Sequence, residues 1–246
     1  MKSRLNSIDT FRGASIVAMI IYHLTWDLSE YFMLYPGLES KWPMILASRT
    51  IGLSFTLIAG ISIHLSKKPL AHGIKILLLA IGLTFVTHFV TPTAAIYFGV
   101  LHLLGCSIIL TALMRPILNK LSRTGILITL VTLFIITFPT AGSGMLKSLN
   151  ILSVSSVDHP ILGFIISAIG FPSNTFTSAD YYPLLPWIFP VMFGYAYSLP
   201  SPQMSLGKIE QKIPKIEILS ALGQYSLPIY LLHQPIMIGV LTLFFR

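Results

Sequence analysis

Residues 11–28 read FRGASIVAMIIYHLTWDL, an apolar run of membrane-spanning length that also carries Arg12, His23 and Asp27. His23 and Asp27 are one helical turn apart, so they lie on one face of the expected helix. Arg12 precedes His23 by eleven residues, roughly 16 Å along a helix axis. Because ionisable groups are costly inside a bilayer, this helix is predicted to carry chemistry at two depths.

The composition is that of an integral membrane protein. Apolar residues make up 54% of the chain, charged residues make up 10%, and the mean hydropathy is +0.80. A soluble domain carries about 25% charged residues. The formal net charge of +8 is scattered between apolar runs without a nucleic-acid-binding motif, so we expect no nucleic-acid partner. The single cysteine, Cys106, allows no internal disulfide, and we expect the first span to remain as an anchor without signal cleavage.

The apolar runs predict an all-α fold, a polytopic bundle of about seven transmembrane helices. The expected spans are residues 11–28, 43–65, 73–91, 94–114, 124–139, 182–199 and 220–245. Each is close to the length of about 20 residues that crosses the hydrocarbon core. An eighth run, residues 160–171, is short and framed by Pro160 and Pro172, which favours a re-entrant or interfacial helix. We expect one domain over residues 1–246.

Basic residues fall unevenly on the connections between these spans. With a cytoplasmic N-terminus, the inner set is Lys2, Arg4, Arg12, Lys67, Lys68, Lys75, Arg115, Lys120, Arg123, Lys208, Lys212 and Lys215, and the outer set is Lys41, Lys147 and Arg246. Positively charged connections stay inside. The sequence therefore predicts a multi-pass plasma-membrane protein with an extracytoplasmic C-terminus. His23 and Asp27 then belong to the extracytoplasmic half.

Five blocks of sequence resemble one family of membrane enzymes. They are RLNSIDTFRGASIVAMIIYHLTWDL (4–28), RTIGLSFTLIAGISI (49–63), YFGVLHLLG (97–105), DYYPLLPWIFPVMFGY (180–195) and LGQYSLPIYLLHQPI (222–236). In this order they are similar to bacterial relatives of heparan-alpha-glucosaminide N-acetyltransferase, in the transmembrane acyltransferase superfamily. The first block is also similar to the acyltransferase 3 family.

The resemblance implies transfer of an acyl group, usually acetyl, from cytosolic acyl-CoA to a hydroxyl or amine of an extracytoplasmic sugar or glycan. Acyl-CoA (acetyl-CoA) is then the co-substrate, and we expect no metal. His23 is the candidate general base or acyl carrier, because imidazole titrates near neutrality. Asp27 is the candidate for orienting its ring. The resemblance implies a catalytic histidine in the loop after the first span, but residues 24–42 contain none. An acyl-histidine route and direct transfer with His23 as base therefore both stay open.

Other candidates for substrate or acyl-CoA binding each have a structural alternative. Asp9 and Arg12 either meet the CoA phosphates or cap the first helix. Arg49 either contacts substrate or pairs with Asp27. His102 either lines a tunnel or makes a buried hydrogen bond.

The remaining candidates stand near the last spans. His233 and Gln234 precede Pro235, where function and helix packing are equally good interpretations. Asp180 and Tyr181 either bind the acceptor or cap a loop, and Trp187 either belongs to the site or anchors the helix at the interface. The other histidines, His64, His72 and His88, are expected to be peripheral.

Two further functional classes stay open beside the enzyme. A proton-coupled transporter would use the same intramembrane histidines and charges to relay protons. A non-catalytic partner in a glycan-assembly complex would bind no acyl-CoA. The expected partners are the lipid bilayer, acyl-CoA and the glycan; the oligomeric state is open, and a homodimer is one option.

Overall fold

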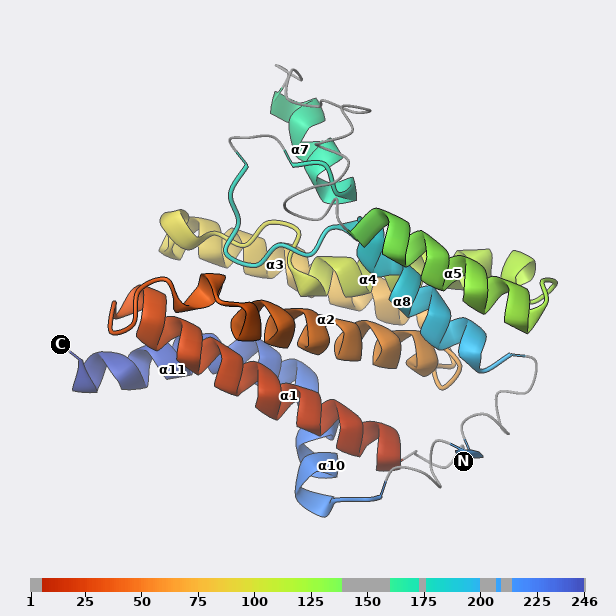
Figure 1. Ribbon diagram of the computed structural model, residues 1–246, viewed down its shortest axis with the longest axis horizontal. Helices are drawn as coiled ribbons and strands as arrows, with labels where there is room; N and C mark the ends of the chain where they lie inside the picture. The colour runs from red at the N-terminus through yellow and green to blue at the C-terminus, as the bar shows by residue number, and fades with distance from the viewer. Residues whose placement is uncertain (1–5, 139–159, 173–175, 200–206, 209–213, 246) are drawn as a thin grey trace. The chain divides into compact units, whose positions relative to one another are not determined.

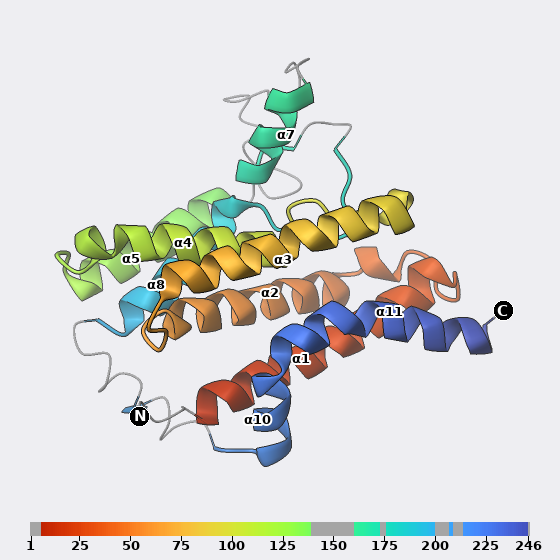
Figure 2. The same ribbon diagram turned by 180° about the vertical axis from the view of Figure 1, so that it is seen from behind.

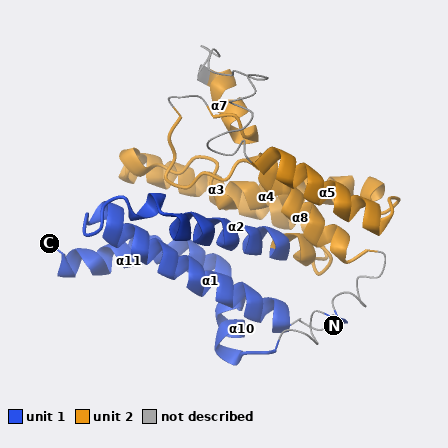
Figure 3. Ribbon diagram, viewed as in Figure 1, with its two compact units in different colours: residues 1–58, 203–246 blue, residues 59–202 orange. Residues whose placement is uncertain are grey.

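The computed structural model describes residues 6–138, 160–172, 176–199, 207–208 and 214–245 (Figure 1). All regular elements in these residues are helices, which confirms the all-α prediction. Five basic residues used to predict the topology, Lys2, Arg4, Lys147, Lys212 and Arg246, lie outside the described residues. The chain groups into two compact units, residues 1–58 with 203–246 and residues 59–202 (Figure 3).

The first unit is built on α1 (Asn6–Trp26), which packs against α10 (Glu217–Gln224) and α11 (Ser226–Phe244), as both Figure 1 and Figure 2 show. It also holds η1 (Asp27–Tyr31), η2 (Leu38–Ser40) and most of α2 (Trp42–Ser62). The backbones of α1 and α10 touch at two glycines. A Cβ at Gly13 would collide with the carbonyl of Leu219, and one at Gly223 with the carbonyl of Asp9.

This close contact explains why the last predicted span, residues 220–245, is two helices. The helical path breaks at Tyr225, whose φ of −99° and ψ of 19° are not helical. Before the break, α10 lies on α1, and Thr10 Oγ1 accepts a hydrogen bond from the backbone N–H of Ile216 at 3.3 Å. Gly223 and Pro228 flank this break, but the apolar residues resume directly after it, so the hydrophobic pattern alone predicts one continuous span.

The second unit contains the end of α2 and the helices between it and the last third of the chain. These are α3 (Pro69–Val90), η3 (Pro92–Ala94), α4 (Val100–Leu118), α5 (Arg123–Thr137), α7 (Pro160–Ile169) and α8 (Leu184–Tyr197). Helix α3 packs along α4, and α8 packs against both α4 and α5. The short helix predicted over residues 160–171 is therefore present as α7.

The fourth predicted span, residues 94–114, begins too early, because α4 starts at Val100. The residues between η3 and α4 are not helical and pair with a later segment. The Ala95 carbonyl accepts from the N–H of Ala179 at 3.1 Å, and the Phe98 carbonyl accepts from the N–H of Tyr182 at 2.9 Å. The pairing holds these residues out of the helix, and Phe98 has a φ of 54°, which lies outside the right-handed helical region, so α4 begins only beyond it.

Within the described residues, four helices are long and apolar enough to cross a bilayer, namely α2, α3, α4 and α11. Helices α5 and α8 are apolar but shorter, and α1 has the length but falls short in apolar character because it carries polar residues such as Asp9, Arg12 and His23. The protein is thus a multi-pass membrane protein. The count of seven spans and the orientation remain predictions.

Candidate functional site

Four polar side chains of the first unit meet between the end of α1 and the middle of α11. His23 comes from α1 and Asp27 begins η1, while His233 and Gln234 come from α11. The rings of His23 and His233 lie 4.9 Å apart between centroids, at an interplanar angle of 53°. We refer to these four residues as the His23 cluster. Two sequence motifs some 200 residues apart are thus brought together: the predicted catalytic pair, and the pair for which function and helix packing were equally good interpretations.

The carboxylate of Asp27 is held by Gln234. The side chain of Asp27 is 0% exposed, and its Oδ1 accepts a hydrogen bond of 2.7 Å from Gln234 Nε2. Because a carboxylate can only accept, the NH2 end of the amide faces Asp27, and Gln234 Oε1 points elsewhere. The expected role of Asp27 in orienting the His23 ring stays a prediction, since the hydrogen bond that the structure gives Asp27 goes to Gln234.

A backbone contact fixes the tautomer of His233. Its Nδ1 lies 2.6 Å from the carbonyl oxygen of Tyr230. A carbonyl only accepts, so Nδ1 carries the hydrogen and, in the neutral ring, Nε2 is left as an acceptor. That Nε2 is buried and has no hydrogen-bond partner among the described residues.

The His23 cluster therefore contains three buried polar atoms without a partner in the described part of the chain. They are Asp27 Oδ2, His233 Nε2 and Gln234 Oε1. All three accept hydrogen bonds. Buried polar groups are seldom left unsatisfied without a functional reason. The group that this arrangement suits is a ligand rich in donors, such as a hydroxyl, an amine or an ammonium group.

Asp9 and Arg12 form an ion pair near the start of α1. Arg12 Nη1 donates to Asp9 Oδ1 at 2.7 Å, and the Asp9 side chain is only 6% exposed. Part of the guanidinium charge is therefore already balanced within the first two turns of the helix, an arrangement in keeping with the capping interpretation of this pair. Arg49 lies half-buried on α2, and its contact with substrate remains a prediction.

In the second unit, Asp180 caps α4. Gly99, which precedes the helix, has no side chain to offer, and Asp180 Oδ2 accepts from the backbone N–H of Val100 at 3.0 Å. A Cβ at Gly99 would lie 2.6 Å from the same oxygen, so the glycine makes room for this cap. Asp180 thus caps a helix rather than a loop, and its contact with the acceptor stays a prediction.

Its neighbour Tyr181 fastens α7 to the same segment. The Tyr181 hydroxyl donates to the Ser167 carbonyl at 2.7 Å, and burial raises the pKa of this hydroxyl above its usual value, so it stays a donor. His102, on α4, lies 3.3 Å from Thr84 Oγ1 through its Nε2. That contact is half-buried, and a tunnel-lining role for His102 stays a prediction.

Trp187 belongs to the packed interior of the second unit. Its side chain is 0% exposed, and its ring packs against those of Phe134, Phe138 and Tyr182 with centroids 5.0 to 6.0 Å apart. A tryptophan that anchors a helix at the membrane interface keeps one edge in the polar headgroup region. The buried ring of Trp187 is instead a core residue of α8.

One cavity has a polar lining that the sequence did not suggest. It measures about 490 Å³ and is lined by His64, Arg115, Asn119, Leu121, Ser122, Arg123, Tyr195 and Leu199, all in the second unit. We call it the Arg115 pocket. His64, expected to be peripheral, is therefore part of a pocket, and Arg115 and Arg123 had signalled only topology. Within the described ranges, no group of three or more His, Cys, Asp or Glu residues is placed to hold a metal ion.

Comparison with known families identifies the chain. The family model described as heparan-alpha-glucosaminide N-acetyltransferase, catalytic, matches residues 4–235. The chain belongs to this family. It is therefore an acetyl-CoA-dependent membrane acetyltransferase, and the transporter alternative gives way to the enzyme. Similarity to the acyltransferase 3 family remains a prediction. Comparisons with curated proteins and with solved structures find no match.

Proposed function

We propose that the protein transfers the acetyl group of cytosolic acetyl-CoA to a hydroxyl or amine of an extracytoplasmic sugar or glycan, and that the His23 cluster binds this acceptor. The observation that carries the proposal is the set of three buried acceptor atoms, Asp27 Oδ2, His233 Nε2 and Gln234 Oε1. A sugar presents several O–H or N–H donors close together, which is the complement of such a set. A thioester carbonyl and a phosphate present only acceptors and would leave it unsatisfied.

His23 is the proposed general base. Its ring is beside that of His233, so an acceptor held by His233 Nε2 lies within reach of His23. As the acceptor oxygen or nitrogen attacks the thioester carbonyl, its proton passes to His23. When the carbon–sulfur bond breaks, the proton moves to the sulfur, and CoA leaves as the free thiol. In the acyl-histidine route, the acetyl group rests on the His23 ring before the acceptor attacks.

Asp27 and Gln234 are proposed as positioning groups in this reaction. The hydrogen bond between them fixes the carboxylate, and the remaining oxygen of each side chain faces the acceptor. Preorganised groups of this kind raise the rate because the acceptor is held in a reactive geometry before the chemical step.

The test is to measure transfer of radiolabelled acetyl groups by purified variants in detergent. His23→Ala is expected to bind acetyl-CoA normally and to lose about 100- to 10,000-fold in kcat, the usual cost of removing a positioned base. Asp27→Asn keeps an oxygen for Gln234 and is expected to lose less. His72→Ala, on the exposed surface of α3, is the matched histidine control. Equal rates for His23→Ala and His72→Ala would reject His23 as the base.

A further inference from the structure

The Arg115 pocket contains two guanidinium groups for which the described residues supply no carboxylate partner. Arg115 Nε donates to the Tyr195 hydroxyl at 3.4 Å, and the Arg123 guanidinium lies over the Tyr197 ring at 5.0 Å from its centroid. The ion pairs seen within the described ranges involve other residues, and the residues that line the pocket include no Asp or Glu. The pocket is thus strongly electropositive.

Its walls hold these charges in place. The Tyr195 side chain, 1% exposed, donates its hydroxyl hydrogen to Asn119 Oδ1 at 2.7 Å. The His64 ring stacks on the Tyr195 ring with centroids 4.3 Å apart and planes at 5°, and its Nε2 lies 2.9 Å from the Tyr195 carbonyl oxygen. A rigid tyrosine therefore sets the position of Arg115, so little ordering is needed when an anion binds.

Two further features of the pocket favour an anion. Arg123 is the first residue of α5 and Ser122 is its N-cap, so the positive end of this helix dipole lies at the pocket. Arg123 Nε is buried and has no hydrogen-bond partner in the described part of the chain. A buried charged donor without an acceptor is costly, and a bound anion would satisfy it.

We propose that the Arg115 pocket binds phosphate groups, and that those of the acyl donor are their source. Guanidinium groups match phosphate oxygens in pairs, and the 3′-phosphate and diphosphate of CoA supply several such oxygens. The positive-inside pattern predicts that Arg115 and Arg123 face the cytosol, where acyl-CoA is found. The choice of this donor rests on the proposed function. The phosphate of an anionic lipid headgroup has the same chemistry and is the other source.

The Arg115 pocket differs in one measurable way from Arg12, the residue that the sequence suggests for binding the phosphates of the acyl donor. Arg12 is ion-paired with Asp9 at 2.7 Å, whereas Arg115 and Arg123 have no carboxylate among the described residues. Phosphate binding therefore competes with an existing ion pair at Arg12, and with none that the described part of the chain forms at the pocket. Substitution of Arg115 or Arg123 is therefore expected to reduce phosphate affinity more than substitution of Arg12 does.

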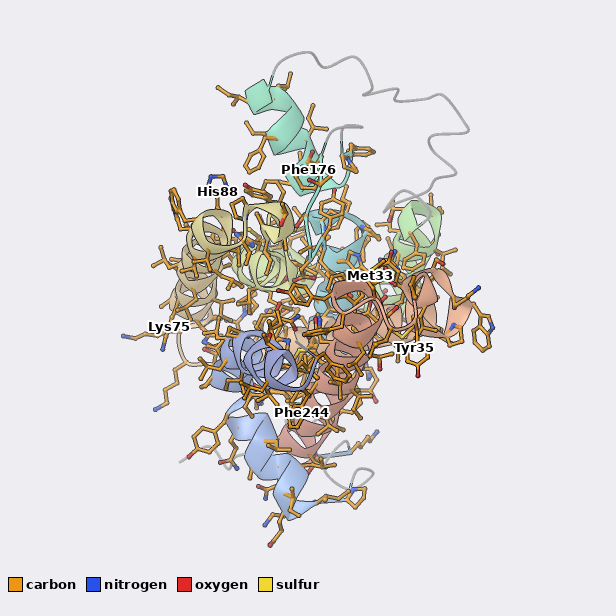
Figure 4. The ribbon with its side chains drawn as sticks, turned by 90° about the vertical axis from the view of Figure 1, so that its left-hand side faces the viewer. Met33, Tyr35, Lys75, His88, Phe176 and Phe244 are labelled. Carbon is orange, nitrogen blue, oxygen red and sulfur yellow. The ribbon has the colours of Figure 1, made fainter. Side chains whose placement is uncertain are left out.

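The test is calorimetric titration of the full-length protein, in nanodiscs of phosphatidylcholine, with CoA and with adenosine 3′,5′-bisphosphate. Arg115→Gln and Arg123→Gln are expected to weaken both affinities by about 10- to 100-fold, the loss of a charge-assisted hydrogen bond. Arg115→Lys, which keeps the charge but not the paired donors, should fall between wild type and Arg115→Gln. Lys75→Gln is the control, because Lys75 projects from the exposed side of α3 (Figure 4).

A parallel titration distinguishes the two sources of phosphate. Wild type and each variant are placed in nanodiscs that contain phosphatidylglycerol. The amount of phosphatidylglycerol that stays bound to each protein is then measured. Loss of CoA affinity in both glutamine variants supports the donor site, whereas loss of retained phosphatidylglycerol with unchanged CoA affinity assigns the pocket to a lipid headgroup. Wild-type behaviour in both assays overturns the proposal. The CoA affinity is measured without turnover. An absence of acetyl transfer would therefore contradict the proposed function, but it would not change the conclusion about CoA binding at the Arg115 pocket.

Discussion

The hydrogen bond between Gln234 and Asp27 gives the sharpest prediction about stability. Gln234→Leu removes the donor that lies 2.7 Å from a carboxylate with 0% exposure. The other oxygen, Asp27 Oδ2, already lacks a partner among the described residues. The substitution therefore leaves neither carboxylate oxygen with a hydrogen bond from these residues. A hydrogen bond to a charged group contributes about 1.5 to 3 kcal/mol, and the variant is expected to lose about that much in its free energy of unfolding.

The assay is denaturation of the purified protein in mixed micelles, together with the rate of acetyl transfer. Gln224→Leu, an exposed glutamine at the end of α10, is the matched control and should leave both unchanged. The double variant Asp27→Leu/Gln234→Leu removes both partners, so it should recover most of the stability while acetyl transfer stays impaired. If Gln234→Leu is as stable and as active as Gln224→Leu, the reasoning about the His23 cluster is refuted.

Three further predictions concern the fold. Gly223→Ala should destabilise the protein by about 1 to 3 kcal/mol, because its Cβ would meet the Asp9 carbonyl, whereas Gly239→Ala has open space and should be neutral or stabilising; equal midpoints would contradict the α1–α10 contact. Asp180→Ala removes the cap of α4 and should cost about 0.5 to 2 kcal/mol in the same denaturation assay. Reporter tags should place the N-terminus in the cytoplasm and residue 246 outside, and tags on one side would refute the predicted topology.

The helices were predictable from the sequence because hydrophobic length is a local property. The runs at 43–65 and 73–91 correspond to α2 and α3 within a few residues at each end. The errors lie where a distant segment determines a boundary. The start of α4 is set by pairing with residues 179 and 182, and the break at Tyr225 accompanies the packing of α10 on α1. Neither partner can be read from the local pattern.

The candidate site divides in the same way. His23, Asp27, His233 and Gln234 were recognisable one by one, since polar groups in apolar spans are costly, but the pairing of Asp27 with Gln234 joins residues 207 apart in the sequence. Arg115 and Arg123 were read as signals of topology because basic residues at span ends usually are. The turn that separates them lacks an acidic residue, and this was the available signal for an anion site.

The most direct test of the account is transfer of an acetyl group across a membrane. Right-side-out vesicles that contain the protein are loaded with radiolabelled acetyl-CoA and given a membrane-impermeant amino sugar outside. Label is expected to accumulate on the external sugar with wild-type protein and with the His72→Ala control, and His23→Ala is expected to reduce the rate by about 100-fold or more. Label that forms only when both substrates are on one side, or transfer by His23→Ala at the wild-type rate, would contradict the account.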